Sequence, residues 1–145
     1  MSSSFSTTYM GLGDVVVVKV HSSGTTIQYS TLLGGNDNDY AIDIDVDNVG
    51  FAYVFGNTMS ADYPTTPSVY RGTRNTSDDC FVTKLNTTGS ALTYSTFLGG
   101  SNFNYGTAIE VDNSGYVYAA GYTYSNGFPV TAGTVGQVLN GPGDS

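Results

Sequence analysis

Short runs of apolar residues, many of them alternating with polar ones, recur along the whole chain. Residues 40–47 are the clearest case, because Ile42, Ile44 and Val46 alternate with acidic residues. A period of two is expected of a strand with one buried face, and residues 26–33 follow the same rule. Residues 15–20 and 51–57 are denser apolar or aromatic runs. No stretch of ten residues shows the three-and-four spacing of an amphipathic helix, so the pattern predicts an all-β protein.

The same four runs occur a second time. Residues 29–35 read YSTLLGG and residues 94–100 read YSTFLGG, an offset of 94 − 29 = 65. The offset predicts a second set of strands at 80–85, 91–98, 105–112 and 116–122. In both sets an Asp-Asn-x-Gly segment, at 47–50 and 112–115, precedes the last strand. This segment predicts a tight hairpin built on a type I turn followed by glycine.

The repeat also defines the expected organisation of the chain. Residues 14–78 and 79–143 are two complete units, residues 144–145 begin a further one, and residues 1–13 are an additional N-terminal connector. Repeated sets of four short antiparallel strands describe the blades of a β-propeller. A β-helix has shorter repeats, and a sandwich gives no reason for a repeat. We therefore predict two tandem, four-stranded, propeller-like blades.

The charge of the chain excludes two classes of partner. The net charge is −8, and charged residues make up 11% of the chain against about 25% in average domains. Without a basic patch, neither nucleic acid nor an anionic membrane surface is an expected partner. No apolar run reaches the roughly 18 residues that span a bilayer. The polar, charge-poor surface suits an extracellular or cell-surface protein, although residues 1–5 show no signal peptide, so export would need another signal or a leader outside this sequence.

Five aspartates in the first unit raise the possibility of a calcium site, because oxygen ligands suit a hard cation. The second unit replaces three of them with Asn102, Asn104 and Ala108, and no EF-hand spacing is present. Strand-edge solvation and turn capping are therefore the favoured interpretation, and we predict no metal site. The five residues are Asp37, Asp39, Asp43, Asp45 and Asp47.

The sequence offers no candidate residues for nucleophilic catalysis. The single histidine, His21, lies in a turn and is matched by Asn86 in the second unit. The single cysteine, Cys80, stands beside Phe81 at a strand start and is expected to be a small buried hydrophobe. We predict no catalytic residue and no cofactor. A hydrolase that uses a pair of carboxylates is the least favoured function.

Two further features relate to sugars. The twelve tyrosines could stack on pyranose rings, but tyrosine is also an ordinary residue for packing blades. Asn75 and Asn86 each begin an Asn-x-Ser/Thr triplet in an expected loop and are candidate glycosylation sites.

Several motifs together resemble a known family, the bacterial β-propeller repeat called SBBP. They are DCFVTKL at 79–85, YSTFLGG at 94–100, AIEVD at 108–112, YAAGYT at 118–123 and Phe128-Pro129, and the first unit carries the same pattern, including DYPTTP at 62–67. The resemblance covers nearly the whole chain. It implies secreted or surface-displayed proteins with many blades, usually without an assigned enzymatic role.

Two blades are too few for a closed propeller, which has four to eight. We therefore expect a non-enzymatic structural or adhesive protein whose blades stack on other copies, in a ring or a filament, or on further repeats of a longer chain. The connector, with Phe5, Tyr9 and Met10, is the candidate self-association segment, as a strand exchanged with a neighbouring chain. A carbohydrate-binding propeller module is the alternative function.

Overall fold

The computed structural model describes residues 4–75 and 78–135 of the chain, and within these ranges it contains eight strands and no helix. All eight expected strands are present to within about one residue, so the all-β prediction is confirmed. The expected start of a further unit at 144–145 lies outside the described residues. The strands are β1 (Val15–Val20), β2 (Ile27–Leu33), β3 (Asp39–Val46), β4 (Ala52–Thr58), β5 (Asp79–Leu85), β6 (Leu92–Leu98), β7 (Asn104–Val111) and β8 (Val117–Thr123).

The grouping of these strands into sheets differs from the expectation. We expected β1 to β4 in one blade and β5 to β8 in the next. The described strands instead form three antiparallel sheets, β1-β2, β3-β4-β5-β6 and β7-β8. The sheets and the sequence repeat are therefore out of phase by half a unit, and the repeat boundary at residue 79 runs through the middle of the four-stranded sheet.

The two kinds of connection explain this phase. After β2, residues 34–38 do not form a hairpin, and both glycines are closely surrounded: a Cβ on Gly34 would lie 2.5 Å from Asp14 Oδ1, and one on Gly35 would lie 2.7 Å from Ser60 Cβ. The chain instead passes to a different sheet before β3 begins. After β4, by contrast, residues 59–75 run back along β6, where Phe97 N–H donates to the carbonyl of Arg71. This return places β5 beside β4 along its full length.

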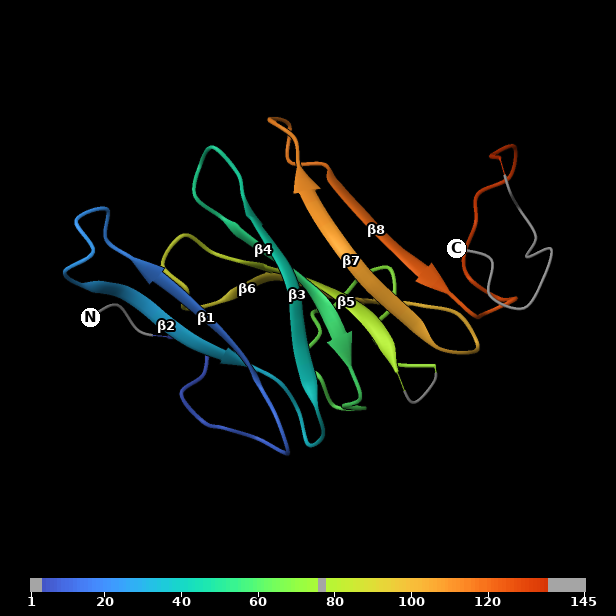
Figure 1. Cartoon of the computed structure of the whole chain (residues 1–145), viewed down its shortest axis with the longest axis horizontal. Helices are drawn as coiled ribbons and strands as arrows, with labels where there is room; N and C mark the ends of the chain where they lie inside the picture. Colours follow the sequence, from blue (N-terminus) through green and yellow to red (C-terminus); the bar gives the residue numbers. More distant parts are fainter. Residues whose placement is uncertain (1–3, 76–77, 136–145) are drawn as a thin grey trace.

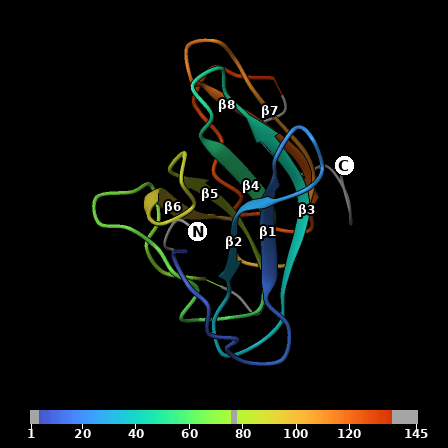
Figure 2. The ribbon, with the colours of Figure 1, turned by 90° about the vertical axis from the view of Figure 1, so that its left-hand side faces the viewer.

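The layers follow one another across the molecule (Figures 1 and 2). We call β3–β6 the complete blade, β1–β2 the leading half-blade and β7–β8 the trailing half-blade. By the offset of 65, the leading half-blade is equivalent to β5–β6 and the trailing half-blade to β3–β4. Figure 1 shows the two half-blades at opposite ends of the molecule, with β3 and β7 side by side near its centre. Among the described residues, no helix is long and apolar enough to span a membrane.

One apolar cluster lies on each face of the complete blade. The cluster toward the leading half-blade is fully enclosed and includes Leu33, Phe81 and Phe97 at 0% exposure. The cluster toward the trailing half-blade has a buried centre around Tyr53 and Phe55, and several of its apolar neighbours stay partly exposed. These neighbours are Phe51, Tyr94, Leu98, Val111 and Val117.

Candidate assembly interface

Equivalent strands of the repeat differ sharply in burial. Every residue of β4 is buried, whereas no residue of its equivalent β8 is buried. In the same way, six of the seven residues of β5 are buried, but β1 buries only Val15 and Val17. β4 and β5 are the two central strands of the four-stranded sheet and have an apolar cluster on each face, whereas β8 and β1 each have a strand partner on one side only. The edges of β8 and β1 are therefore the candidate functional surfaces.

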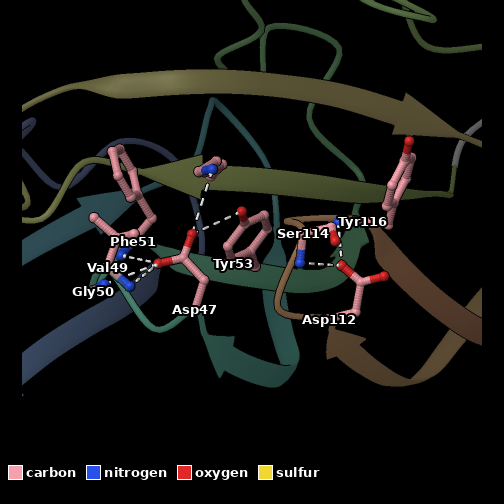
Figure 3. Close-up of polar contacts among 9 residues, drawn as sticks. Asp47, Val49, Gly50, Phe51, Tyr53, Asp112, Ser114 and Tyr116 are labelled. Atoms are coloured by element: carbon pink, nitrogen blue, oxygen red, sulfur yellow. Dashed lines mark hydrogen bonds and ion pairs between the residues drawn. The ribbon is translucent and has the colours of Figure 1, made fainter.

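At the end of β3, Asp47 organises a polar cluster beside the complete blade (Figure 3). Its Oδ1 accepts the backbone N–H groups of Val49, Gly50 and Phe51 at 2.9–3.1 Å, which closes the hairpin between β3 and β4. Gly50 has φ +99°, the conformation that the predicted turn requires. The hydroxyl of Tyr53 donates to Oδ2 at 3.0 Å. The turn-capping interpretation of Asp47 is confirmed.

Lys84, on β5, completes this cluster. Its Nζ lies 3.6 Å from the Asp47 carboxylate, 4.3 Å from the centre of the Phe51 ring and 4.6 Å from that of Tyr53. The side chains of Lys84 and Asp47 are 17% and 8% exposed. Partial burial raises the pKa of Asp47, but the hydrogen bonds from Phe51, Tyr53, Gly50 and Val49 outweigh it, so that this pKa lies below its ordinary value. The cluster is thus a binding site for an ammonium group, formed by two aromatic rings and a carboxylate.

The equivalent cluster at the end of β7 has the same carboxylate, with Tyr116 at the position of Phe51 and without a lysine (Figure 3). Asp112 Oδ1 accepts the N–H groups of Ser114 and Tyr116 at 2.9 Å, and Tyr118 donates its hydroxyl to Oδ2 at 3.3 Å. The rings of Tyr116 and Tyr118 are 70% and 62% exposed. No described residue forms an ion pair with Asp112. By the repeat, the missing lysine is Lys19, which is exposed on β1 at the other end of the molecule.

A cavity of about 300 Å³ lies beside the edge of β8. Its walls include Cys80, Leu98, Gly121 and Phe128. Their equivalents in the first repeat, Val15, Leu33, Gly56 and Tyr63, surround a single side chain, that of Phe81. The ring of Tyr63 stacks on Phe81 at 4.3 Å, a Cβ on Gly56 would lie 2.8 Å from the Phe81 ring, and Val15 and Leu33 belong to the same cluster. The cavity therefore corresponds to the pocket that Phe81 fills in the first repeat, but no equivalent side chain among the described residues fills it here.

Polar side chains attach the trailing half-blade to the complete blade. The carboxylates of Asp43 and Asp45 accept the N–H groups of Ile109 and Val111 of β7 at 2.9 and 2.7 Å. We expected both carboxylates at a solvated strand edge, and they instead reach the neighbouring strand. Asn57, buried on β4, accepts the N–H of Gly106 at 3.1 Å and donates to the carbonyl of Asn104.

The other two aspartates considered for calcium have local roles. Asp37 Oδ1 accepts the N–H of Asn38 at 2.9 Å. Asp39 is 3% exposed, and its Oδ2 accepts the N–H of Gly35 and the hydroxyl of Ser60. Its burial raises the pKa of the Asp39 carboxyl. Within residues 4–75 and 78–135, no group of three or more His, Cys, Asp and Glu side chains is placed to hold a metal ion.

His21 and Cys80 lie where the sequence places them. His21 is exposed in the turn after β1, and its Nδ1 lies 2.8 Å from the Ser23 hydroxyl. Cys80 is 5% exposed on β5, as expected of a small buried hydrophobe. Burial raises the pKa of its thiol to about 12.

The N-terminal connector lies on its own chain in this structure. The N–H of Leu32 donates to the carbonyl of Ser6, and the N–H of Phe5 donates to the carbonyl of Gly89. Ser6 thus covers the outer edge of β2 as its equivalent, Arg71, covers the outer edge of β6. The side chains of Phe5, Tyr9 and Met10 are exposed. Their role as an exchanged segment stays a prediction.

The two glycosylation candidates differ in their surroundings. Asn75 is exposed, while the next two residues of its triplet lie outside the described ranges. Asn86 is half-buried, and its Nδ2, the atom that would carry a glycan, donates to the Ser90 hydroxyl at 3.0 Å. Its Oδ1 accepts the N–H of Ser90, so Asn86 holds the turn after β5 together. Glycosylation of either residue stays a prediction.

Reasoning from the sequence missed the residues that matter most at this interface, namely Lys84, Asn57 and the Asp112 cluster. The sequence does contain a signal for Lys84, since Lys19 and Lys84 match across the repeat. No such signal exists for Asn57, because its equivalent is Tyr122.

Comparison with known proteins identifies the repeat. Residues 28–64 match the model of a family described as β-propeller repeat, SBBP. The matched segment runs from β2 through β3 and β4 into the loop beyond, and so crosses from the leading half-blade into the complete blade. No curated protein matches the chain. This match over residues 28–64 agrees with the resemblance that the motifs indicated.

Proposed function

We propose that this chain is a non-enzymatic structural protein of the extracellular space or cell surface that assembles through its two half-blades. The observation that carries the proposal is the contrast between β4, buried throughout, and its equivalent β8, which buries none of its residues. A blade of this repeat has four strands, whereas the leading and trailing half-blades have two strands each. Other copies, or further repeats, would supply the missing strands.

Completing the half-blades is physically favourable. An unpaired strand edge offers a row of N–H and C=O groups to another strand. The leading half-blade also exposes an apolar face, with Val16 at 60% and Val18 at 44% exposure. Burying a valine-sized side chain contributes about 1.5–3 kcal/mol, so several such residues can offset the cost of association. The outer edges of β2 and β6 are already covered by residues 4–8 and 66–73, whereas the edges of β1 and β8 are unpaired within the described part of the chain.

Light scattering coupled to size exclusion tests the proposal. Over a dilution series of the full chain, we expect a mass above the 15.2 kDa of one copy that falls on dilution. A β-rich, folded monomer at every concentration would overturn self-assembly as the function. A ring would elute as one discrete species, whereas a filament would give a broad distribution whose mass grows with concentration.

A carbohydrate-binding role is favoured by one separate observation. Phe103, Tyr105 and Tyr122 form a continuous aromatic row, with ring centres 6.4 and 5.1 Å apart and stacked in both pairs. Tyr124 meets Tyr122 edge to face at 6.0 Å. Exposed rings of this kind can stack on sugar faces. Glycan-array binding that disappears in Tyr122→Ala but not in Tyr70→Ala, an exposed tyrosine outside the row, would support this function, and equal loss in both variants would refute it.

A further inference from the structure

We infer that a second copy of this chain docks its leading half-blade onto the trailing half-blade of the first, with β1 pairing antiparallel to β8 and Lys19 entering the Asp112 cluster. The inference deepens the proposed function and rests on it. The pairing of β4 with β5 in the complete blade is the model for this contact, because β4 is equivalent to β8 and β5 is equivalent to β1.

The register follows from the repeat. In the complete blade Tyr53 pairs with Lys84 and Val54 with Thr83. Adding 65 to the first residue of each pair and subtracting 65 from the second gives Tyr118 opposite Lys19 and Ala119 opposite Val18 of the second copy. A slip by one residue would turn the apolar side chains of β1 to the wrong face, so the register is strongly specified.

In this register Lys19 lies where the first cluster holds its lysine. Lys84 reaches Asp47, Phe51 and Tyr53 from the strand next to β4. Asp112 presents the same carboxylate next to β8 (Figure 3), and Tyr116 and Tyr118 take the positions of Phe51 and Tyr53. Within its own copy, the side chain of Lys19 has no hydrogen-bond or ion-pair partner among the described residues. The Asp112 cluster is therefore incomplete without a second copy.

The same register brings an apolar side chain to the cavity beside β8. Val16 is equivalent to Phe81, the residue that fills the corresponding pocket in the first repeat. Exposed on its own copy, Val16 would lie opposite Gly121, as Phe81 lies opposite Gly56. Gly24 would meet the ring of Tyr94 in the same way, since its equivalent Gly89 contacts the ring of Tyr29 and nothing described lies within 4 Å of a Cβ on Gly24.

β1 of the same copy does not complete β8. β1 and β8 of one copy lie at opposite ends of the structure, with the complete blade between them (Figure 1). Two docked copies still present an unpaired β1 at one end and an unpaired β8 at the other. The contact is therefore head-to-tail, and it continues to a ring or a filament.

Cysteine cross-linking between two single variants tests the register. Val18→Cys and Ala119→Cys, both at exposed positions, are mixed and oxidised gently, and covalent dimers are read on a non-reducing gel. Paired strand residues have Cβ atoms about 4.5–5.5 Å apart, close to the spacing that a disulfide needs. We expect dimers in the mixture and not in either variant alone. Native Cys80 does not compete, because it is buried in β5.

The matched control replaces Val18→Cys by Val20→Cys, which is exposed and lies two residues along the same face, away from the cavity that Cys80 lines. Its distance to position 119 grows to about 7–8 Å, so that cross-linking should fall at least several-fold. Equal cross-linking in both mixtures would overturn the register. If the mixture associates in light scattering but Val18→Cys and Ala119→Cys do not link, the inference is wrong while the proposed function stands. If the mixture stays monomeric, the proposed function itself fails.

Substitution of Lys19 tests the ammonium site. Lys19→Met should weaken association at least tenfold, measured as the dissociation constant from the dilution series. Lys19→Arg, which keeps the positive charge, should stay within about threefold of the wild type. Lys19 is exposed on β1, so neither variant should change the urea midpoint of the dilute monomer. Unchanged association of Lys19→Met would contradict the role of Lys19.

Discussion

Replacing Asn57 by alanine probes the seam between the complete blade and the trailing half-blade. The Asn57 side chain is 6% exposed and makes two hydrogen bonds to the backbone of β7, one from Gly106 N–H and one to the Asn104 carbonyl. In Asn57→Ala both backbone groups lose their partner at a buried place. The variant therefore removes this part of the polar attachment, together with the weaker contacts of Asn57 Nδ2 to Asp78 and Cys80, and leaves the hydrogen bonds of Asp43 and Asp45 in place.

The expected cost follows from those two groups. A buried polar group without a partner costs about 1–3 kcal/mol, and water entering the space that alanine leaves would recover part of this. We expect the free energy of unfolding to fall by about 2–4 kcal/mol. With a urea slope of about 2 kcal/mol/M, typical of small proteins, the unfolding midpoint should drop by about 1–2 M.

Urea unfolding followed by circular dichroism measures this change, at a protein concentration low enough that association does not contribute. Asn48→Ala is the matched control, because Asn48 is exposed in the β3–β4 turn and should stay within about 0.5 kcal/mol of wild type. Hydrogen exchange at the Gly106 amide should also accelerate in Asn57→Ala. A midpoint as high as that of the control would refute the reasoning about the seam.

Three further outcomes are expected. Gly106→Ala should lower the free energy of unfolding by about 1–3 kcal/mol in the same urea assay, because its Cβ would lie 2.5 Å from the Phe55 ring, whereas Ala41→Gly, at the equivalent position, should cost less. Asp47→Asn should flatten the pH dependence of stability below about pH 4. Because the folded-state pKa of Asp47 is lowered, the ionised carboxylate stabilises the fold above the unfolded pKa of about 3.9, and this contribution is lost as the pH falls through the folded-state pKa. A loss of stability in acid equal to that of the wild type would contradict this. The thiol of Cys80, with its pKa raised to about 12, should not react with a disulfide reagent at pH 8 until urea unfolds the chain, and rapid labelling of the folded protein would be the opposing result.

The sequence predicts the strands well because each strand is a local pattern. Alternation at Ile42, Ile44 and Val46 and the glycine at position 50 place β3 and its hairpin with β4, although these three apolar side chains are exposed and do not form the buried face that the alternation indicated. The repeat adds the second set of strands without further information. These features depend on neighbours within a few residues, which a single sequence contains.

The grouping of strands into sheets could not be predicted in the same way. Periodicity gives the length of a repeat but not its phase relative to the blades, and the phase depends on contacts between distant segments. The Gly34-Gly35 pair is an example. We expected it only to end a strand, yet both residues are needed because a side chain at either would collide with Asp14 or Ser60. The carboxylates of Asp43 and Asp45 likewise acquire their role from β7, which lies far along the chain.

Hydrogen–deuterium exchange at low and high protein concentration tests the central claim most directly. If other copies complete the half-blades, backbone amides of β8 and β1 become protected as concentration rises, while amides of β4 and β5, already paired on both sides, stay unchanged. Protection should appear at 117–123 and 15–20 together, since each strand is the partner of the other. Association that leaves both segments exchanging as fast as in the dilute protein would contradict the account.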